Sequence, residues 1–237
     1  MERLRTYFFR AKRHTLFPVN LEIRQRIFFN RVAEDFGTRA WATGRVAERQ
    51  AIRRWTAERI IYGENILDVG VGNGLMFQYL KRKINYTGID ISENMLIQAG
   101  IRARHYGIPF TALQGNAAAL PFPDSSFDTV MCIDMFHHIP RFLRSRVLGE
   151  LVRVVRPRGQ IIIEIKNQWN PFIACGYLIG GMVHGVTMVP VNPFNVRHYF
   201  SETGFHIQDK FIVPPRICPP FIVFDLRQGT GDVRVIQ

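Results

Sequence analysis

The stretch "ILDVGVGNG", residues 66–74, alternates three glycines directly after a short apolar run that contains Asp68. A short apolar run predicts a buried strand, and clustered glycines predict a tight turn after it. In α/β folds, a glycine-rich turn between a strand and a helix lets a ligand approach the backbone closely. We therefore interpret residues 66–74 as the first strand and the ligand-binding loop of an α/β domain.

Short apolar runs alternate with helix-like segments along the rest of the chain. The predicted strands lie at 66–70, 86–91, 110–115, 127–133, 160–165, 206–213 and 221–227. The predicted helices lie within 21–62 and at 75–83, 92–107, 140–157 and 192–204. Such alternation predicts a doubly wound, Rossmann-like α/β sheet of seven strands, mostly parallel, preceded by N-terminal helices. Because only PPRICPP separates the last two runs, we expect one antiparallel strand near the edge of the sheet.

The spacing of the glycines narrows the choice of ligand. Gly70, Gly72 and Gly74 form GxGxG, whereas a dinucleotide site uses GxGxxG, whose third glycine lets the helix pack beneath a pyrophosphate. The more compact loop favours a ligand without a phosphate. Asp90 closes the second predicted strand, where a carboxylate can accept hydrogen bonds from both ribose hydroxyls. The ligand is therefore expected to contain a nucleoside.

A second stretch, residues 114–139, carries a family resemblance. Within it, "GNAAALPFPDSSFD" resembles class I S-adenosylmethionine-dependent methyltransferases, and especially the group with the ubiquinone and menaquinone C-methyltransferases (methyltransferase type 11 domain). The resemblance covers residues 66–166, and "FSETGF" at 200–205 fits it too, but 1–50 and 167–196 are poorly covered. It implies S-adenosyl-L-methionine as the cofactor and S-adenosyl-L-homocysteine as the product.

The resemblance also implies which residues bind this cofactor. Those expected around the methionine portion are Asp68, Gly70, Gly72, Asn73 and Gly74. Asp90 is expected to hold the ribose, with Ile91 against the adenine face. Asn116, through its side chain, and Ala117, through its backbone N–H, are expected at the adenine edge. Ile133 is expected near the amino-acid tail of the cofactor.

The acceptor side departs from the family. Where the quinone methyltransferases have an arginine soon after the fourth strand, this sequence has "FHHI", with His137 at the corresponding position. His137 or His138 is a candidate base, although such a pair can simply begin the next helix. Asp134, Glu164 and Asn167 follow strand ends and are expected to face one crevice. A buried, paired carboxylate is an equally good interpretation of Glu164.

The front of the chain is strongly basic. The 237 residues contain 31 Lys and Arg against 19 Asp and Glu, and residues 1–60 alone hold 14 basic and 6 acidic side chains. Aromatic residues lie among these arginines, which suits either an anionic membrane surface or single-stranded nucleic acid. The charge-free residues 167–196 favour the membrane, because they offer nothing to phosphates. We therefore divide the chain into a basic helical segment, 1–60, for membrane docking or as a lid, and a methyltransferase domain, 61–237.

Residues 167–196 contain no Asp, Glu, Lys or Arg. A membrane span here would separate the fifth strand from the last two, and several glycines weaken a plain helix. We interpret this insertion as an apolar lid or wall over the acceptor site, in contact with a bilayer surface; a core-packing insertion is the alternative. It predicts a small lipophilic acceptor, quinone-like or lipid-like, methylated by in-line displacement.

The sequence also bears on three alternative functions and on the cellular compartment. An RNA or protein methyltransferase would carry an NPPY-like tetrapeptide after the fourth strand for a base amine, but "CIDM" stands there. A non-catalytic accessory protein that binds the cofactor would have a broken glycine loop, and the GxGxG spacing disfavours a nicotinamide oxidoreductase. The cysteines, at 132, 175 and 218, form no metal-binding spacing and suit a reducing compartment. We therefore expect a cytoplasmic protein that works at the inner face of the membrane, with no metal.

Overall fold

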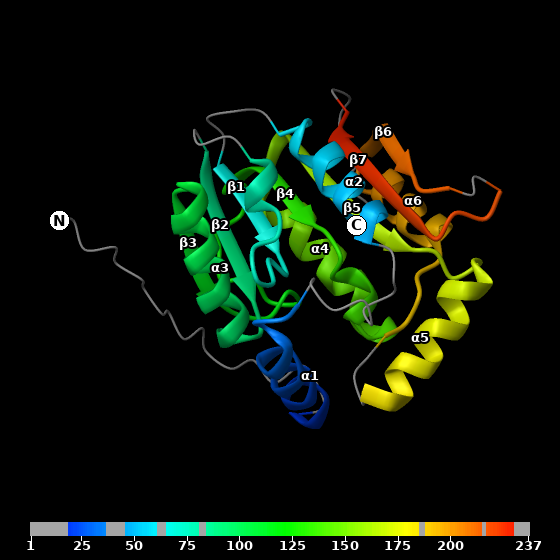
Figure 1. Ribbon diagram of the computed structural model, residues 1–237. Helices are drawn as coiled ribbons and strands as arrows, with labels where there is room; N and C mark the ends of the chain where they lie inside the picture. The colour runs from blue at the N-terminus through cyan, green and yellow to red at the C-terminus, as the bar shows by residue number, and fades with distance from the viewer. Residues whose placement is uncertain are drawn as a thin grey trace. The chain divides into compact units, whose positions relative to one another are not determined.

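The computed structural model describes most of the chain, namely residues 19–36, 46–60, 65–80, 84–184, 188–214 and 217–229. Seven strands form one sheet in the order β3-β2-β1-β4-β5-β7-β6 (Figure 1). The strands are β1 (Asn65–Val69), β2 (Asn85–Asp90), β3 (Phe110–Gln114), β4 (Phe127–Cys132), β5 (Val155–Lys166), β6 (Phe205–Ile212) and β7 (Phe221–Gln228). The α-helices are α1 (Val19–Val32), α2 (Val46–Ala57), α3 (Glu93–Tyr106), α4 (Arg144–Val154), α5 (Pro171–His184) and α6 (Pro193–Glu202).

The strand directions confirm the predicted fold class. β2 pairs in parallel with β1 and β3, and β4 pairs in parallel with β5. β7 runs antiparallel to both β5 and β6, so the single antiparallel strand lies next to the edge, as expected. Contacts within the chain divide it into two compact units, Met1–Pro121 and Phe122–Gln237. This boundary differs from the one expected after residue 60, which stays a prediction.

In the first unit, capping residues define both ends of α3. Ser92 precedes this helix, and its hydroxyl accepts a hydrogen bond from the Met95 backbone N–H at 3.1 Å, which satisfies one of the free donors of the first turn. The same hydroxyl donates to the Asn30 side chain of α1 at 2.6 Å. Gly107 ends α3 with a φ of 67°, the left-handed conformation that favours glycine. These contacts fasten α1 to the start of α3.

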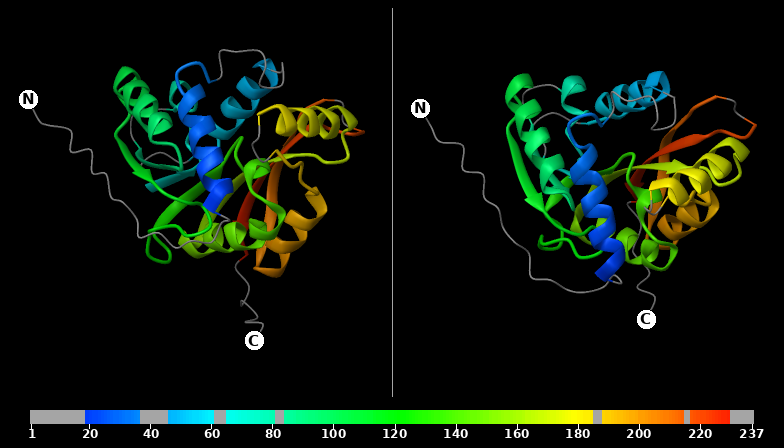
Figure 2. Two further views of the ribbon diagram at one scale, coloured as in Figure 1. Left: turned by 90° about the horizontal axis from the view of Figure 1, so that it is seen from below. Right: turned by 60° about the horizontal axis from the view of Figure 1, so that its bottom comes forward.

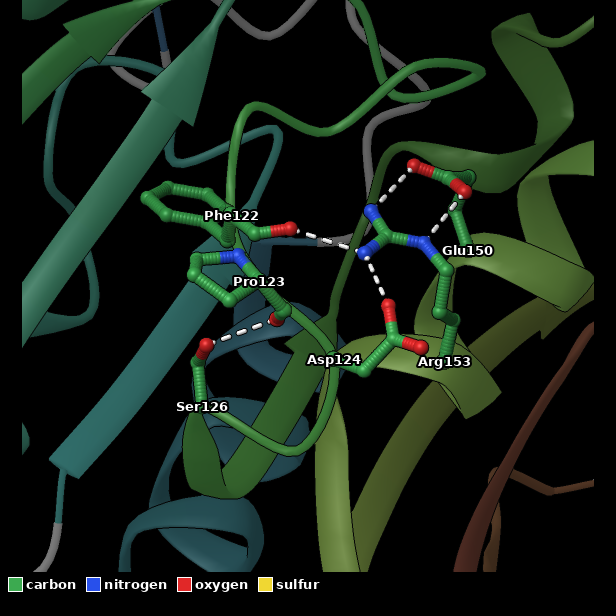
Figure 3. Close-up of polar contacts among 6 residues, drawn as sticks. All are labelled: Phe122, Pro123, Asp124, Ser126, Glu150 and Arg153. Carbon is green, nitrogen blue, oxygen red and sulfur yellow. Dashed lines mark hydrogen bonds and ion pairs between the residues drawn. The ribbon is translucent and has the colours of Figure 1, made fainter.

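In the second unit, hydrogen bonds and ion pairs hold the turn of the most specific family signature (Figure 3). The stretch "LPFPDSSFD", residues 120–128, forms a turn and then enters β4 at Phe127. Arg153 of α4 lies 2.8 Å from the carboxylates of Asp124 and Glu150. Its guanidinium also donates to the Phe122 carbonyl at 2.8 Å. The acidic turn of the motif therefore fixes the start of β4 against α4, and its role here is structural.

Two segments differ from the sequence expectation. The helix expected over 75–83 is only a short 3₁₀ turn, η1 (Phe77–Tyr79), among the described residues. Phe77 explains this, because its buried ring lies 5.2 Å from the Tyr86 ring and 5.0 Å from the Phe110 ring, which fixes the chain after one turn.

The glycines of the apolar insertion, which we expected to weaken a helix, do not prevent one, because α5 forms there. The Asn170 side chain accepts the Ile173 backbone N–H at 3.1 Å, and Pro171 follows at the first helical position. An N-cap and a proline at this position both favour helix formation, and they offset the weak propensity of the internal glycines.

Two glycines of the binding loop give predictions of different size for an alanine substitution. Both have a positive φ, 55° at Gly72 and 77° at Gly74, but only Gly74 is crowded. A Cβ there would lie 2.6 Å from the Phe77 ring, whereas one on Gly72 meets nothing within 4 Å. We expect Gly74→Ala to lower the free energy of unfolding by about 2–5 kcal/mol and Gly72→Ala by about 1–2 kcal/mol. Urea denaturation measures both, and equal losses would contradict the packing role of Gly74.

Candidate cofactor and acceptor sites

Two hydrogen bonds, one to the backbone and one to a side chain, fasten the GxGxG loop to the end of β2. The Gly70 N–H donates to the Ile89 carbonyl at 2.8 Å, and the Gly72 N–H donates to Asp90 Oδ2 at 2.9 Å. Because no side chain covers the position of a Gly72 Cβ, this part of the loop can admit a ligand against the backbone. Gly74 instead supports the packing of Phe77, as described above.

Asp90 is positioned for the role that the resemblance implies. Its Oδ1 accepts the Ser92 backbone N–H at 2.9 Å, so both carboxylate oxygens are fixed by backbone donors. Each oxygen has a second lone pair, which leaves acceptors for the two hydroxyls of a ribose. Burial raises the pKa of Asp90 to about 6, and the hydrogen bonds from Ser92 and Gly72 offset part of that rise.

Asp68 is more deeply buried than Asp90. It is 5% exposed, and its Oδ2 accepts a hydrogen bond from the Tyr86 hydroxyl at 2.6 Å. Burial raises the pKa of Asp68 to about 7, although the Tyr86 hydrogen bond lowers it. Arg53 of α2 adds a weaker attraction that also lowers the pKa. A cationic ligand group beside Asp68 would stabilise the ionised carboxylate further.

Asn73 connects the loop to the end of α1. Its amide nitrogen donates to the Ala33 carbonyl at 3.0 Å and to the Phe36 carbonyl at 2.8 Å. Its side-chain oxygen is buried and accepts no hydrogen bond from the described residues. Arg102 of α3 donates to the Asn73 backbone carbonyl. Asn73 therefore positions the loop, while its buried oxygen is an acceptor that a cofactor group can satisfy.

The residues expected around the adenine lie after β2 and β3. Asn116 forms a local turn in which its Oδ1 accepts the Ala118 N–H at 2.9 Å, and its amide nitrogen lies 3.4 Å from Glu22 Oε2 of α1. Ile91 and Ala117 are half-buried. The nucleoside site expected in this unit is therefore bordered by α1 as well as by the strand ends.

The second unit brings the acceptor candidates together after β4. His137 lies in the short 3₁₀ turn η2 (Phe136–His138) and is 4% exposed, whereas His138 and Ile133 are half-buried. Burial lowers the pKa of His137 well below its ordinary value, and the neighbouring His138 and Lys166 lower it further. His137 is therefore neutral near pH 7, so one ring nitrogen is available as an acceptor, but its lowered pKa makes it a weaker base than a free histidine.

A buried ion cluster lies beside this histidine. The Lys166 ammonium, at the end of β5, is 2.7 Å from Asp134 Oδ1 and 2.5 Å from Glu164 Oε1. Glu164 also accepts the Asp134 backbone N–H at 2.8 Å, and Asp134 has a positive φ of 56°. Burial lowers the pKa of Lys166, but the two carboxylates outweigh it and keep the pKa above its usual value. Glu164 is thus a paired, buried carboxylate, one of the two interpretations open from the sequence.

Two other elements complete this region. Tyr177 of α5 is buried, and its ring centroid lies 5.1 Å from that of His137. The Val189 N–H donates to the His137 carbonyl at 2.9 Å. Asn167, expected in the same crevice, instead binds the Pro219 carbonyl at 2.9 Å and the Trp169 N–H at 3.1 Å. The side chain of Asn167 is therefore engaged in holding loops together.

The fold and the loop define a nucleoside-binding protein of the Rossmann-like class, and comparison with known proteins gives the family. Residues 67–163 match the family described as a methyltransferase domain. This part of the chain therefore resembles a methyltransferase domain, which confirms the family resemblance and the cofactor predicted from the sequence.

Relatives and solved structures agree with this assignment. The chain is 37% identical over 123 residues to a phosphatidylethanolamine N-methyltransferase of Cereibacter sphaeroides, covering 51% of this chain and 59% of that enzyme. It is 26% identical over 196 residues to a ubiquinone biosynthesis O-methyltransferase of Proteus mirabilis, covering 73% and 78%. The chain thus spans less than two thirds of the length of the first of these relatives.

A solved structure shows the same fold. The magnesium protoporphyrin IX methyltransferase of Synechocystis, solved with bound S-adenosylhomocysteine, superposes with a TM-score of 0.66 at 20% identity. The superposition covers 88% of this chain and 100% of that one. At this identity the likeness concerns the fold, and the roles of individual site residues stay predictions.

Sequence reasoning missed several residues of these sites. Lys166 and Tyr177 were not singled out, and neither was Tyr86. A usable signal existed for Lys166, because residues two apart on a strand share a face and Glu164 precedes it by two. Tyr86 and Tyr177 reach their partners from other segments of the chain, and no local pattern reveals such contacts.

The raised pKa values predict how pH affects stability and cofactor binding. Between pH 4 and 7 Asp68 and Asp90 bind more protons in the folded protein than in the unfolded chain, so their contribution to the stability without ligand should fall as the pH rises. His137, whose pKa is lowered, contributes in the opposite direction below about pH 6.5. Affinity for S-adenosylhomocysteine should change in the opposite sense, because its ammonium group favours ionised Asp68. We expect calorimetric affinity to rise about tenfold or more from pH 5.5 to 8.

Tyr86→Phe isolates the contribution of one hydrogen bond to this pH dependence. Without the Tyr86 hydroxyl, the pKa of Asp68 rises, so the increase in affinity should shift to higher pH. Tyr79→Phe, in η1 of the same unit, is the matched control and should leave the profile unchanged. An affinity that does not vary with pH would show that neither carboxylate contributes to binding.

The ion cluster predicts a large effect for a single lysine. Lys166→Met leaves the Asp134 and Glu164 carboxylates buried without their cation, and we expect a loss of about 3–5 kcal/mol in the free energy of unfolding. Lys210→Met removes an exposed lysine from β6 and should change stability by about 0.5 kcal/mol or less. Urea denaturation at pH 7 compares the two, and a loss below about 1 kcal/mol for Lys166→Met would refute the pairing.

Proposed function

We propose that this protein transfers a methyl group from S-adenosylmethionine to a small lipophilic acceptor of the quinone or lipid type. The observation that carries the proposal is the buried, neutral His137, which packs against Tyr177 of a helix that has no charged side chain. The two relatives named above, a phospholipid methyltransferase and a ubiquinone methyltransferase, support an acceptor of this kind.

The first unit would bind and orient the cofactor. Asp90 would accept the ribose hydroxyls, while Asp68 would face the cationic methionine portion. The open backbone at Gly72 would let that portion lie against the loop. The cofactor itself supplies the activation, because its sulfonium makes the methyl group electrophilic. Binding and alignment are therefore the main tasks of these residues.

The second unit would prepare the acceptor. A neutral His137 can take a proton from an acceptor hydroxyl, amine or acidic carbon as the new bond to the methyl group forms. Burial is the main reason why its pKa is low; the charges of His138, Lys166 and Arg144 lower it further, and Asp134 raises it. The Lys166 cluster would hold Asp134 and the start of η2 in place, as positioning residues.

His137→Gln tests the proposed base. We expect this variant to lower kcat by about 10²–10⁴-fold, because it removes proton transfer but keeps a polar side chain of similar size. His138→Gln, at the half-buried neighbour, should stay within about threefold of the wild type. The kcat of both variants is measured with radiolabelled S-adenosylmethionine and a lipid extract. Equal activity of His137→Gln and wild type would eliminate His137 as the base.

The substrate class needs a direct experiment. Methyl-labelled S-adenosylmethionine is incubated with the protein and a whole-cell extract, and the label is followed into lipid, nucleic-acid and protein fractions. Label in the lipid fraction supports the proposal. Label in RNA or protein would favour the alternative methyltransferases, and cofactor binding without transfer would favour an accessory protein.

We also propose that the enzyme works at an anionic membrane surface on the cytoplasmic side. The expectation that the basic aromatic N-terminus makes this contact concerns residues 1–18, which lie outside the described part of the chain. Within the described ranges, no helix combines the length and the apolar composition needed to cross a membrane.

A further inference from the structure

α5 presents large apolar side chains to solvent along one side. Phe172, Leu178, Ile179 and Met182 are between 61% and 78% exposed, and we call these four residues the α5 outer face. Their spacing of three, four and seven residues along the helix places them on neighbouring positions of one side. Single exposed apolar residues are common, but four on one helix mark an interaction surface.

The opposite side of the same helix faces the protein. Ile173 and Tyr177, four residues apart, are 4% and 3% exposed. Tyr177 contacts the ring of His137, the candidate base. α5 therefore separates the proposed acceptor site from whatever the α5 outer face contacts, with only the thickness of one helix between them.

A neighbouring loop extends the apolar surface at the start of α5. Trp169, just before the helix, is 59% exposed, and Ile217, between β6 and β7, is fully exposed. The two loops are joined, because the Cys218 thiol donates to the Trp169 carbonyl at 2.9 Å and Asn170 donates to the Cys218 carbonyl at 2.7 Å. Both views in Figure 2 show α5 beside the connection between β6 and β7.

The charges near this surface indicate its partner. Apart from Lys166, which is paired in the ion cluster, residues 135–149 and 165–201 hold four arginines, and the acidic residues that follow these two ranges are Glu150 and Glu202. Among these arginines, Arg144 binds the Pro190 and Val189 carbonyls just after α5. Exposed apolar side chains on a charge-free helix with arginines nearby complement an anionic lipid surface. The surface of a second basic copy of this chain would offer no such complement.

We infer that the α5 outer face, with Trp169 and Ile217, inserts into the interface of an anionic lipid bilayer. At 14 residues the helix is about 21 Å long, so it is too short to span a bilayer and lies in its plane. The inference deepens the proposed function and rests on it, because a lipid acceptor could then pass from the bilayer around α5 to Tyr177 and His137. The inserted surface lies on α5, so this contact is separate from the one proposed for the basic N-terminus.

A pair of matched double variants tests the insertion. Phe172→Ser with Met182→Ser removes two apolar side chains from the α5 outer face. Ile97→Ser with Ile101→Ser removes two apolar side chains of α3 that are each 46% exposed. Co-sedimentation with phosphatidylcholine vesicles containing phosphatidylglycerol should weaken about tenfold or more for the α5 pair and change less than about twofold for the α3 pair.

Trp169 provides an optical readout of the same contact. Replacing Trp41 and Trp55 with Phe leaves it as the single tryptophan of the chain. Its emission should shift to shorter wavelength with anionic vesicles and should be quenched by lipids brominated on the acyl chain. Unchanged emission in the presence of bound vesicles would overturn the inference, because the contact would then lie elsewhere.

A separate measurement of cofactor binding distinguishes a failure of the membrane insertion from a failure of the proposed function. Calorimetry with S-adenosylhomocysteine on each variant reports the cofactor site, and a wild-type protein that fails to bind it overturns the proposed function whatever the vesicles show. Intact cofactor binding with equal vesicle binding of the α5 pair and the wild type overturns the insertion alone. A lipid-free dimer that the α5 pair dissociates would also overturn it, since a second copy would then cover the surface.

Discussion

The hydrogen bond from the Gly72 backbone to Asp90 is the constraint on which the cofactor site depends. It joins the loop after β1 to the end of β2, and Gly72 makes it with a positive φ of 55°. The same carboxylate accepts the Ser92 N–H at the start of α3. One acidic side chain thus fixes a loop, a strand end and a helix start around the space where a nucleoside would bind.

In the second unit, an ion cluster of one ammonium group and two carboxylates fixes the ends of two strands. Lys166 holds Asp134 and Glu164 at the ends of two neighbouring strands, where uncompensated carboxylates would be costly to bury. Their positive partner keeps the turn after β4 fixed, and it adds to the effect of burial, the main cause of the lowered pKa of His137. Structural pairing and tuning of a candidate base are therefore two effects of the same ammonium group.

The sequence predicts most of the fold because apolar runs and caps are local signals. All seven strands form where the runs lie, and Ser92 begins α3 as expected. β5 starts earlier, at Val155, because its first residues pair with β4 through a register shift. The glycine loop and Asp90 could also be predicted, because their spacing along the sequence forms a recognisable motif. The contacts of Tyr86 with Asp68 and of Tyr177 with His137 join distant segments, so only the folded chain reveals them.

Titration calorimetry of the purified protein tests the central claim most directly. S-adenosylhomocysteine and NADH are titrated separately into the wild type and into Asp90→Asn, which keeps the shape of the side chain but removes its charge. We expect S-adenosylhomocysteine to bind the wild type, Asp90→Asn to bind it about tenfold or more weakly, and NADH not to bind. Binding of NADH, or a wild type with no affinity for S-adenosylhomocysteine, would contradict a loop built for a sulfonium nucleoside.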